Sequence, residues 1–211
     1  SRLMDYVVTT GDGYADLLER YADLTGHAPE FPEWAAGFWQ CKLRYKSQEE
    51  LLAVAREHKR RGLPMSVIVI DYLHWTKMGE WSFDKTCWPD PAAMVRELKQ
   101  LGIEVMVSVW PTVNPKSAHF GHLTRRKLLV RTRRGPGALI HFTDTNATGV
   151  VHLHLLDSLH PEARRFLWSK LRQNYLRHGI RIFWLDAIEP EMAVYDHGNV
   201  LYHEGNGLAG G

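Results

Sequence analysis

One pattern occurs three times in the sequence and restricts the fold more than any other feature. A helix-forming segment ends at a glycine and an apolar run follows, in KRRGLPMSVIVID, KQLGIEVMVSVW and LRHGIRIFWLD. Gly62, Gly102 and Gly179 stand where a positive φ angle closes a helix, which glycine adopts without steric cost. The apolar runs lack polar alternation, which is typical of strands buried on both faces. The sequence therefore predicts helices that alternate with parallel strands.

The starts of the predicted helices carry capping residues. Ser47 and Glu50 form a capping box, in which Ser47 accepts a backbone hydrogen bond and Glu50 reaches back to the helix start. Asp90 is an N-cap that precedes Pro91 at the first helical position. Residues 35–42 (AAGFWQCK) are predicted to form a strand ahead of these helices. The expected order is a lead-in helix followed by β-α-β-α-β-α-β.

This alternation places the chain in the α/β class, as a (β/α)₈ TIM barrel or a doubly wound sheet. No glycine-rich nucleotide-binding motif follows a strand, so nothing supports the second possibility. A complete barrel has eight strands in about 250 residues. We therefore expect residues 35–211 to form the N-terminal half of a barrel, with only the first four βα units. Residues 1–34 would form a lead-in helix and a linker, and residues 114–158 an irregular excursion with one or two strands.

Composition and charge restrict the function classes. A net charge of +2 in 211 residues does not favour a nucleic-acid partner, and no apolar run is long enough to cross a membrane. The chain shows no signal-peptide pattern, and Cys41 and Cys87 form no C-x-x-C motif. These features favour a reducing, cytoplasmic compartment, although they leave the location open.

Acidic and aromatic residues stand at the ends of the predicted strands. Asp71 follows the second strand and Trp110 ends the third, while Trp184 and Asp186 end the fourth. Chemistry in barrels occurs at the C-terminal ends of strands. Carboxylates act on sugar hydroxyls or the anomeric carbon, and aromatic rings stack on sugar faces. These positions therefore predict a carbohydrate site.

The segments around these residues resemble glycoside hydrolase family 31, and within it the α-xylosidase branch. The motif that carries the resemblance is Trp184-x-Asp186-x-x-Glu189 at a strand end. Four other segments resemble that family and follow its order: GFWQCKLRYKSQEEL, VIVIDYLHW, FDKTCWPDPAAMVRELKQLGIEVMVSVWPTV and HPEAR. The resemblance covers most of the chain and is weakest from about residue 118 to residue 151.

The resemblance implies a retaining α-glycosidase that needs neither a metal nor an organic cofactor. It assigns Asp186 as the nucleophile and Asp71 as the acid that hydrogen-bonds a sugar hydroxyl. Trp110 and Trp184 would form pocket walls, and Glu189 would help to hold the site. The family's general acid/base lies beyond residue 211, so the missing C-terminal half of the barrel is the expected partner. The 211-residue chain alone is expected to show little or no turnover.

The position of Leu73 predicts the substrate. In the family that the chain resembles, glucosidases carry an Asp-x-Asp motif after the second strand, and its second Asp reaches the 6-hydroxymethyl group of the sugar. Here the motif is Asp71-Tyr72-Leu73, and Leu73 cannot make that bond. A site that leaves a buried hydroxyl unpaired loses affinity for it, which favours α-xylosides over α-glucosides. An α-glucosidase of the same family and a non-catalytic carbohydrate-binding half-barrel remain alternatives.

Several features have simpler interpretations. In isolation, Asp186 would be a turn residue or a helix cap, Asp71 a structural hydrogen-bond partner, and both tryptophans core residues. The pairs His119/His122 and His152/His154 lack the third and fourth ligands of a zinc site, so no metal site is predicted. The basic RTRRG segment is typical of a solvated loop.

Overall fold

The computed structural model describes residues 6–132, 135–137, 140–145, 147–188, 200–203 and 205–206. The helices are α1 (Tyr14–Thr25), α2 (Gln48–Arg60), α3 (Pro91–Gln100), α4 (Phe120–Arg125) and α5 (Pro161–Asn174), with 3-10 turns η1 (Glu33–Ala36) and η2 (Leu176–His178). The strands are β1 (Trp39–Gln40), β2 (Val67–Ile70), β3 (Glu104–Val109), β4 (Thr112–Val113), β5 (Arg131–Thr132), β6 (Gly135–Pro136), β7 (Ile140–Thr143), β8 (Val150–Leu155), β9 (Ile182–Leu185), β10 (Val200–Tyr202) and β11 (Gly205–Asn206).

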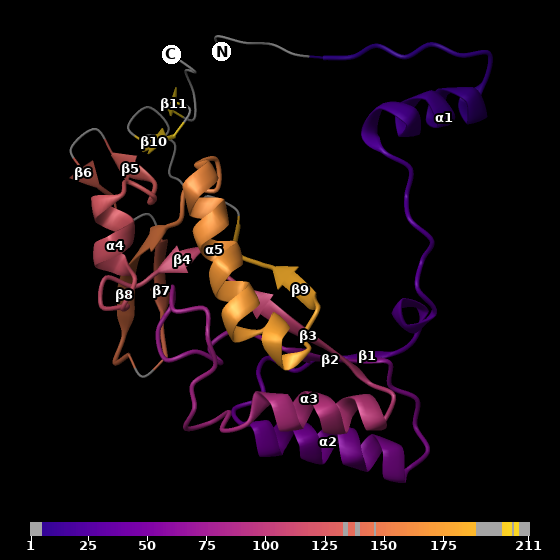
Figure 1. Cartoon of the computed structure of the whole chain (residues 1–211), viewed down its shortest axis with the longest axis vertical. Coiled ribbons are helices and arrows are strands. Elements are labelled where there is room, and N and C mark those ends of the chain that lie inside the picture. Colours follow the sequence, from indigo (N-terminus) through magenta and orange to yellow (C-terminus); the bar gives the residue numbers. More distant parts are fainter. Residues whose placement is uncertain are drawn as a thin grey trace.

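The main sheet has four parallel strands in the order β1-β2-β3-β9. Its register pairs Val107 of β3 with Ile70 of β2 on one side and with Phe183 of β9 on the other. Helices α2 and α3 lie side by side against the sheet, and α5 lies beside β9 (Figure 1). Apolar side chains of these helices and of β2 and β3 form the larger core. The predicted α/β alternation with parallel strands is thus confirmed for these elements.

The glycines that close the helices have the predicted backbone conformation. The φ angles of Gly62, Gly102 and Gly179 are 67°, 76° and 95°. At the other end of α2, the Ser47 hydroxyl accepts from the Glu50 N–H at 3.2 Å. The Glu50 side chain reaches back to the helix start as predicted, where its carboxylate accepts from the Lys46 N–H, one residue before the cap, at 2.6 Å. The Lys42 ammonium donates to the other oxygen of the same carboxylate.

The first strand is shorter than predicted. Residues 33–36 form a 3-10 turn that the Gly37 N–H closes on the Trp34 carbonyl, so only Trp39–Gln40 pair with β2. The predicted lead-in helix is present as α1, which has no buried residue and stands apart from the sheet (Figure 1).

The fourth strand is not buried on both faces, contrary to the prediction. Strand β9 is the edge of the described sheet, and Trp184 and Leu185 are 38% and 59% exposed. Only Phe183 packs against the larger core. The apolar run therefore predicted a strand correctly, while burial depended on neighbours that the described part of the chain does not supply.

The segment after β3 contains more structure than the predicted one or two strands. Strands β4, β8 and β7 form an antiparallel sheet, and α4 precedes β5, which pairs with β6 and β10. The excursion also begins earlier, because Thr112 already pairs with Leu155. Every helix in the described ranges is too short or too polar to span a lipid bilayer.

Candidate active site

The residues that follow the four strands of the main sheet lie together at the C-terminal end of the sheet, which is called the strand-end edge below. These strand-end residues are Cys41, Asp71, Trp110 and Asp186, after β1, β2, β3 and β9. The Trp110 Nε1–H donates to Asp186 Oδ2 at 3.0 Å. Burial is the main cause that raises the pKa of Asp71, and the charge of Asp186 adds to it; burial likewise raises the pKa of Cys41, and the charge of Asp71 adds to it. The structure therefore brings both predicted acids and Trp110 together, and it adds Cys41, which the sequence analysis did not assign to the site.

Asp186 is held from the side of β3. Its backbone N–H donates to the Val109 carbonyl at 3.0 Å, which continues the β3–β9 pairing beyond the last strand residue. The indole of Trp110 fixes the carboxylate through a hydrogen bond to a charged acceptor, a type that is stronger than a neutral one. Ala187 then turns the chain with a φ angle of 51°. The carboxylate is thus oriented along the strand-end edge while it remains partly exposed.

Asp71 is more deeply placed, with 7% of its surface exposed. Its Oδ1 accepts from the Tyr72 N–H at 2.7 Å. Burial is the largest cause that raises the pKa of Asp71, and the Asp186 charge acts in the same direction, while the Tyr72 hydrogen bond opposes them. Two carboxylates on one edge with different environments can take different roles in one reaction.

The turn after β2 has an unusual backbone. Leu73 adopts a φ angle of 61°, which costs a non-glycine residue roughly 1 kcal/mol or more. The next residue, His74, is 1% exposed and hydrogen-bonds the Asp71 carbonyl through Nδ1 at 2.9 Å. Its Nε2 lies 2.8 Å from the hydroxyl of Tyr175, the residue that ends α5. Burial lowers the pKa of His74 to about 4 and raises that of Tyr175, so both side chains are neutral at ordinary pH.

The two predicted pocket tryptophans occupy different environments. The Trp110 ring stacks on Tyr72 with 5.1 Å between ring centroids and a 6° interplanar angle, and it also contacts Phe142 of β7. One face of Trp110 is therefore covered. Trp184 forms no aromatic pair among the described residues and stands two positions before Asp186. The side chains of Phe183 and Leu185 line an apolar cavity against α5. Because side chains alternate along a strand, Trp184 points to the other face of β9.

A further buried acid, Asp144, follows β7 and holds the loop that continues from the turn after β2. It is 2% exposed and accepts from the Met78 N–H at 3.0 Å, the Asn114 amide at 2.6 Å and the Trp75 indole at 3.3 Å. These bonds tie the excursion to the loop between β2 and α3. Asp144 and Leu73 also line a cavity of about 330 Å³. Apart from the neighbouring Thr145 N–H, the hydrogen-bond partners of the Asp144 carboxylate are 30 to 69 positions away, and no motif surrounds it, so sequence reasoning missed it.

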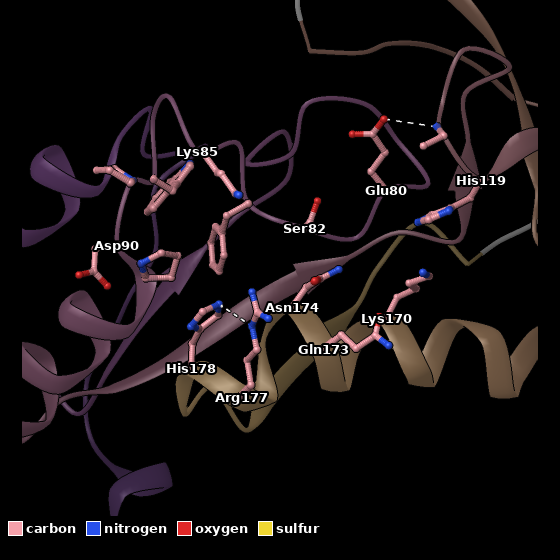
Figure 2. A pocket seen from close by; sticks show the side chains of 15 residues that line it. Glu80, Ser82, Lys85, Asp90, His119, Lys170, Gln173, Asn174, Arg177 and His178 are labelled. Carbon is pink, nitrogen blue, oxygen red and sulfur yellow. Dashed lines mark hydrogen bonds between the residues drawn. The ribbon is translucent and has the colours of Figure 1, made fainter.

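A larger cavity, of about 580 Å³, lies elsewhere. Figure 2 shows Lys85 on the loop between β2 and α3 and Lys170 and Arg177 on the segment of α5 and η2. Neither Asp71 nor Asp186 lines this cavity. The candidate active site is therefore the strand-end edge and not this cavity.

The predicted residue Glu189 lies outside the residues that the structure describes. In the described ranges no group of three His, Cys, Asp or Glu side chains could hold a metal ion.

Comparison with known proteins identifies the family. The model described as "Glycosyl hydrolases family 31 TIM-barrel domain" matches residues 28–207. The chain belongs to glycosyl hydrolase family 31. The four parallel strands of the main sheet are accordingly part of a TIM-barrel domain.

Three relatives within this family match nearly the whole chain. The "Uncharacterized family 31 glucosidase ORF2" of Pseudescherichia vulneris is 47% identical over 96% of this chain and 37% of its own length. Alpha-xylosidase A of Aspergillus niger is 40% identical over 89% of this chain and 25% of its own. The crystal structure of a family 31 α-xylosidase from a soil metagenome, complexed with xylose, is 46% identical with a TM-score of 0.83. It covers 94% of this chain, which in turn spans 28% of that protein.

The chain thus spans between 25% and 37% of these relatives. All three are named as glycosidases of this family or as α-xylosidases, and their names differ in the sugar. The comparisons therefore show the family, whereas the activity and the substrate of the whole protein are proposed below from the site.

Proposed function

We propose that the full-length protein containing this chain is a retaining α-xylosidase that releases terminal α-xylosyl residues from oligosaccharides. The observation that carries the proposal is the edge where Asp71, Trp110 and Asp186 meet, with the Asp186 carboxylate oriented by the Trp110 indole. The chain would contribute the first four βα units of the barrel. The remaining units would contribute the general acid/base and close the pocket.

In this proposal Asp186 is the nucleophile. One of its carboxylate oxygens bonds to the anomeric carbon as the glycosidic C–O bond breaks, and the leaving oxygen receives a proton from the acid/base residue. Water then hydrolyses the glycosyl-enzyme ester. The hydrogen bond from Trp110 directs one carboxylate oxygen and leaves the other available for attack. Asp71, held in its buried turn, would accept a hydrogen bond from a sugar hydroxyl.

Substrate choice would rest on Leu73. The left-handed backbone at this residue fixes the direction of an apolar side chain in the turn after Asp71. An apolar group there offers no partner to a 6-hydroxymethyl group, and a buried unpaired hydroxyl costs about 1–3 kcal/mol. Xylose lacks that group. The α-xylosidase names among the relatives agree with this assignment, and Glu189 and Trp184 are proposed to support the nucleophile and line the pocket.

The substrate proposal is tested by turnover of the full-length protein on aryl α-xyloside and aryl α-glucoside. We expect kcat/KM to be at least about tenfold higher for the xyloside, which corresponds to about 1.4 kcal/mol. Faster hydrolysis of the glucoside would identify an α-glucosidase instead. Sugar binding without hydrolysis of either compound would favour a non-catalytic carbohydrate-binding protein.

The role of Asp186 is tested by covalent labelling with 5-fluoro-α-xylosyl fluoride. Fluoride leaves without a general acid, so the same reagent serves for the full-length protein and for the 211-residue chain. We expect mass spectrometry to locate the label on the peptide that contains Asp186, and Asp186→Asn to abolish labelling. A label on another carboxylate would refute the assignment.

A further inference from the structure

The turn after β2 is closed by a side chain and not by the backbone. No backbone N–H of the turn donates to the Asp71 carbonyl in this part of the structure; its partner is Nδ1 of His74, at 2.9 Å. The backbone carbonyl of His74 is used elsewhere, because it accepts from the Asp84 N–H at 2.8 Å. The imidazole therefore replaces the hydrogen bond that normally crosses a tight turn, and it does so around Leu73, whose backbone is left-handed.

The protonation pattern of this imidazole follows from its partners. The carbonyl of Asp71 can only accept, so Nδ1 of His74 must carry the proton. A neutral imidazole then has an acceptor at Nε2, and the Tyr175 hydroxyl donates to it at 2.8 Å. Both imidazole nitrogens of His74 and the Tyr175 hydroxyl therefore have a hydrogen-bond partner. The ring orientation is thus fixed at both ends, by the turn on one side and by the end of α5 on the other.

Tyr175 extends the connection to the second acid. Its ring packs edge-on against Phe83, with centroids 5.1 Å apart, and against Phe183 of β9, with centroids 6.3 Å apart. Phe183 lies three positions before Asp186 and packs against the core. His74 and Tyr175 therefore connect the turn after β2 to β9, two strands that β3 separates in the sheet.

We propose that His74 is a positioning residue that sets Asp71 and Leu73 for sugar recognition, with Tyr175 orienting its ring. This inference rests on the proposed function, because it assigns a role in the same site. His74 does not reach the sugar. It acts through the Asp71 carbonyl, so its loss displaces the residues that discriminate xylose from glucose and alters specificity more than overall stability would explain.

Two substitutions separate the two ends of the ring. In His74→Asn the side-chain amide can occupy the position of Nδ1 and keep the bond to the Asp71 carbonyl. In His74→Gln the longer amide reaches the position of Nε2 and keeps the bond to Tyr175 while losing the turn. The two variants differ by one methylene, and both remove the imidazole.

The experiment measures kcat and KM for aryl α-xyloside and aryl α-glucoside in the full-length protein and both variants. We expect His74→Asn to retain kcat/KM for the preferred glycoside within about threefold. His74→Gln should lose at least about tenfold and should change the xyloside-to-glucoside ratio by at least about threefold. Equal activity of the two variants with unchanged ratios would overturn the proposal, because the volume of the side chain and not its bond to the Asp71 carbonyl would then determine the activity.

Stability controls accompany this comparison. Leu98→Ala in α3 truncates a fully buried side chain away from the strand-end edge, and it should lower Tm without changing the substrate ratio. If the His74 variants do not fold, Tyr175→Phe tests the Nε2 end of the imidazole, since it removes one hydroxyl and leaves the bond from Nδ1 to the Asp71 carbonyl in place. Its kcat/KM should fall by no more than about threefold, as in His74→Asn, with a changed xyloside-to-glucoside ratio because the imidazole is no longer oriented; an unchanged ratio would overturn the proposal. A wild-type protein that prefers glucosides refutes the substrate proposal alone, because the His74 comparison is then made on that substrate.

Discussion

Asp71 and Asp186 stand at the same edge of one sheet, yet the chain supports them differently. Asp71 follows β2, in which every residue is buried, and its turn is closed by His74. Asp186 follows β9, an edge strand whose last residue, Leu185, is 59% exposed. The first acid thus follows a strand that the chain's own core buries, and its carboxylate accepts from the Tyr72 N–H. The second is held from the β3 side alone, which indicates that further parts of the protein complete its surroundings.

The largest effect that would test this difference concerns packing. Ile70→Ala in the buried β2 should lower the free energy of unfolding by about 3 kcal/mol through lost burial and the resulting cavity. Leu185→Ala in β9 should cost less than about 0.5 kcal/mol in the 211-residue chain, because its side chain is already largely in water. Urea denaturation of the two variants measures both values.

The same two variants, measured in the full-length protein, report whether β9 is covered there. There the cost of Leu185→Ala should rise toward that of Ile70→Ala, if neighbouring barrel units cover β9. A cost that stays below about 0.5 kcal/mol in both forms would show that β9 remains an exposed edge.

A smaller effect concerns the bond that orients Asp186. Trp110→Phe preserves an aromatic ring beside Tyr72 but removes the Nε1–H that donates to the carboxylate. Hydrogen bonds to charged groups contribute about 1.5–3 kcal/mol, so we expect kcat of the full-length protein to fall by roughly 10- to 100-fold. Single-turnover kinetics would measure the glycosylation step. A rate within about twofold of wild type would mean that β3 contributes little to holding Asp186.

The smallest effect concerns the protonation of His74, in the turn that follows Asp71. His74 has a pKa of about 4 in the folded protein, below the ordinary value of 6.5 that it regains on unfolding. Between these values the unfolded chain binds a proton that the folded chain does not. Proton binding to His74 in the unfolded chain therefore lowers the free energy of unfolding progressively as the pH falls from 6.5 toward 4. Above pH 6.5 this loss is absent and the full stability is present. Wild type should lose about 1 kcal/mol more than His74→Asn between pH 6 and pH 5, as measured by denaturation at each pH. Parallel losses would show that His74 is solvated.

The sequence predicted the features that depend on neighbouring residues along the chain. The glycines after α2 and α3, the cap at Asp90 and the apolar runs of β2 and β3 follow local rules, and the structure confirms them. The strand ends then located Asp71, Trp110 and Asp186 on one edge, because parallel strands present their C-terminal ends together. The exposure of β9 was wrong, since an apolar run does not report whether both of its faces are covered.

Interactions between distant segments could not be predicted in this way. The bond between Trp110 and Asp186 joins residues 76 positions apart, and that between His74 and Tyr175 joins residues 101 apart. Asp144 is polar, isolated in sequence and buried, so its role depends wholly on the loop that folds over it. Such partners carry no periodic signal and become visible only once the strands are assembled.

The strand-end residues also bear on how proteins with this architecture diverge after gene duplication. Cys41, Asp71, Trp110 and Asp186 each occupy the first position beyond a strand. The side chains of Cys41, Asp71 and Asp186 belong to neither apolar cluster, whereas Trp110 packs against the smaller one. Selection can therefore replace Cys41, Asp71 or Asp186 and alter which ligand binds at the strand-end edge, while the register of the sheet stays unchanged. Cys41, a small and exposed side chain beside Asp71, is the position in this row where such a change would disturb the least.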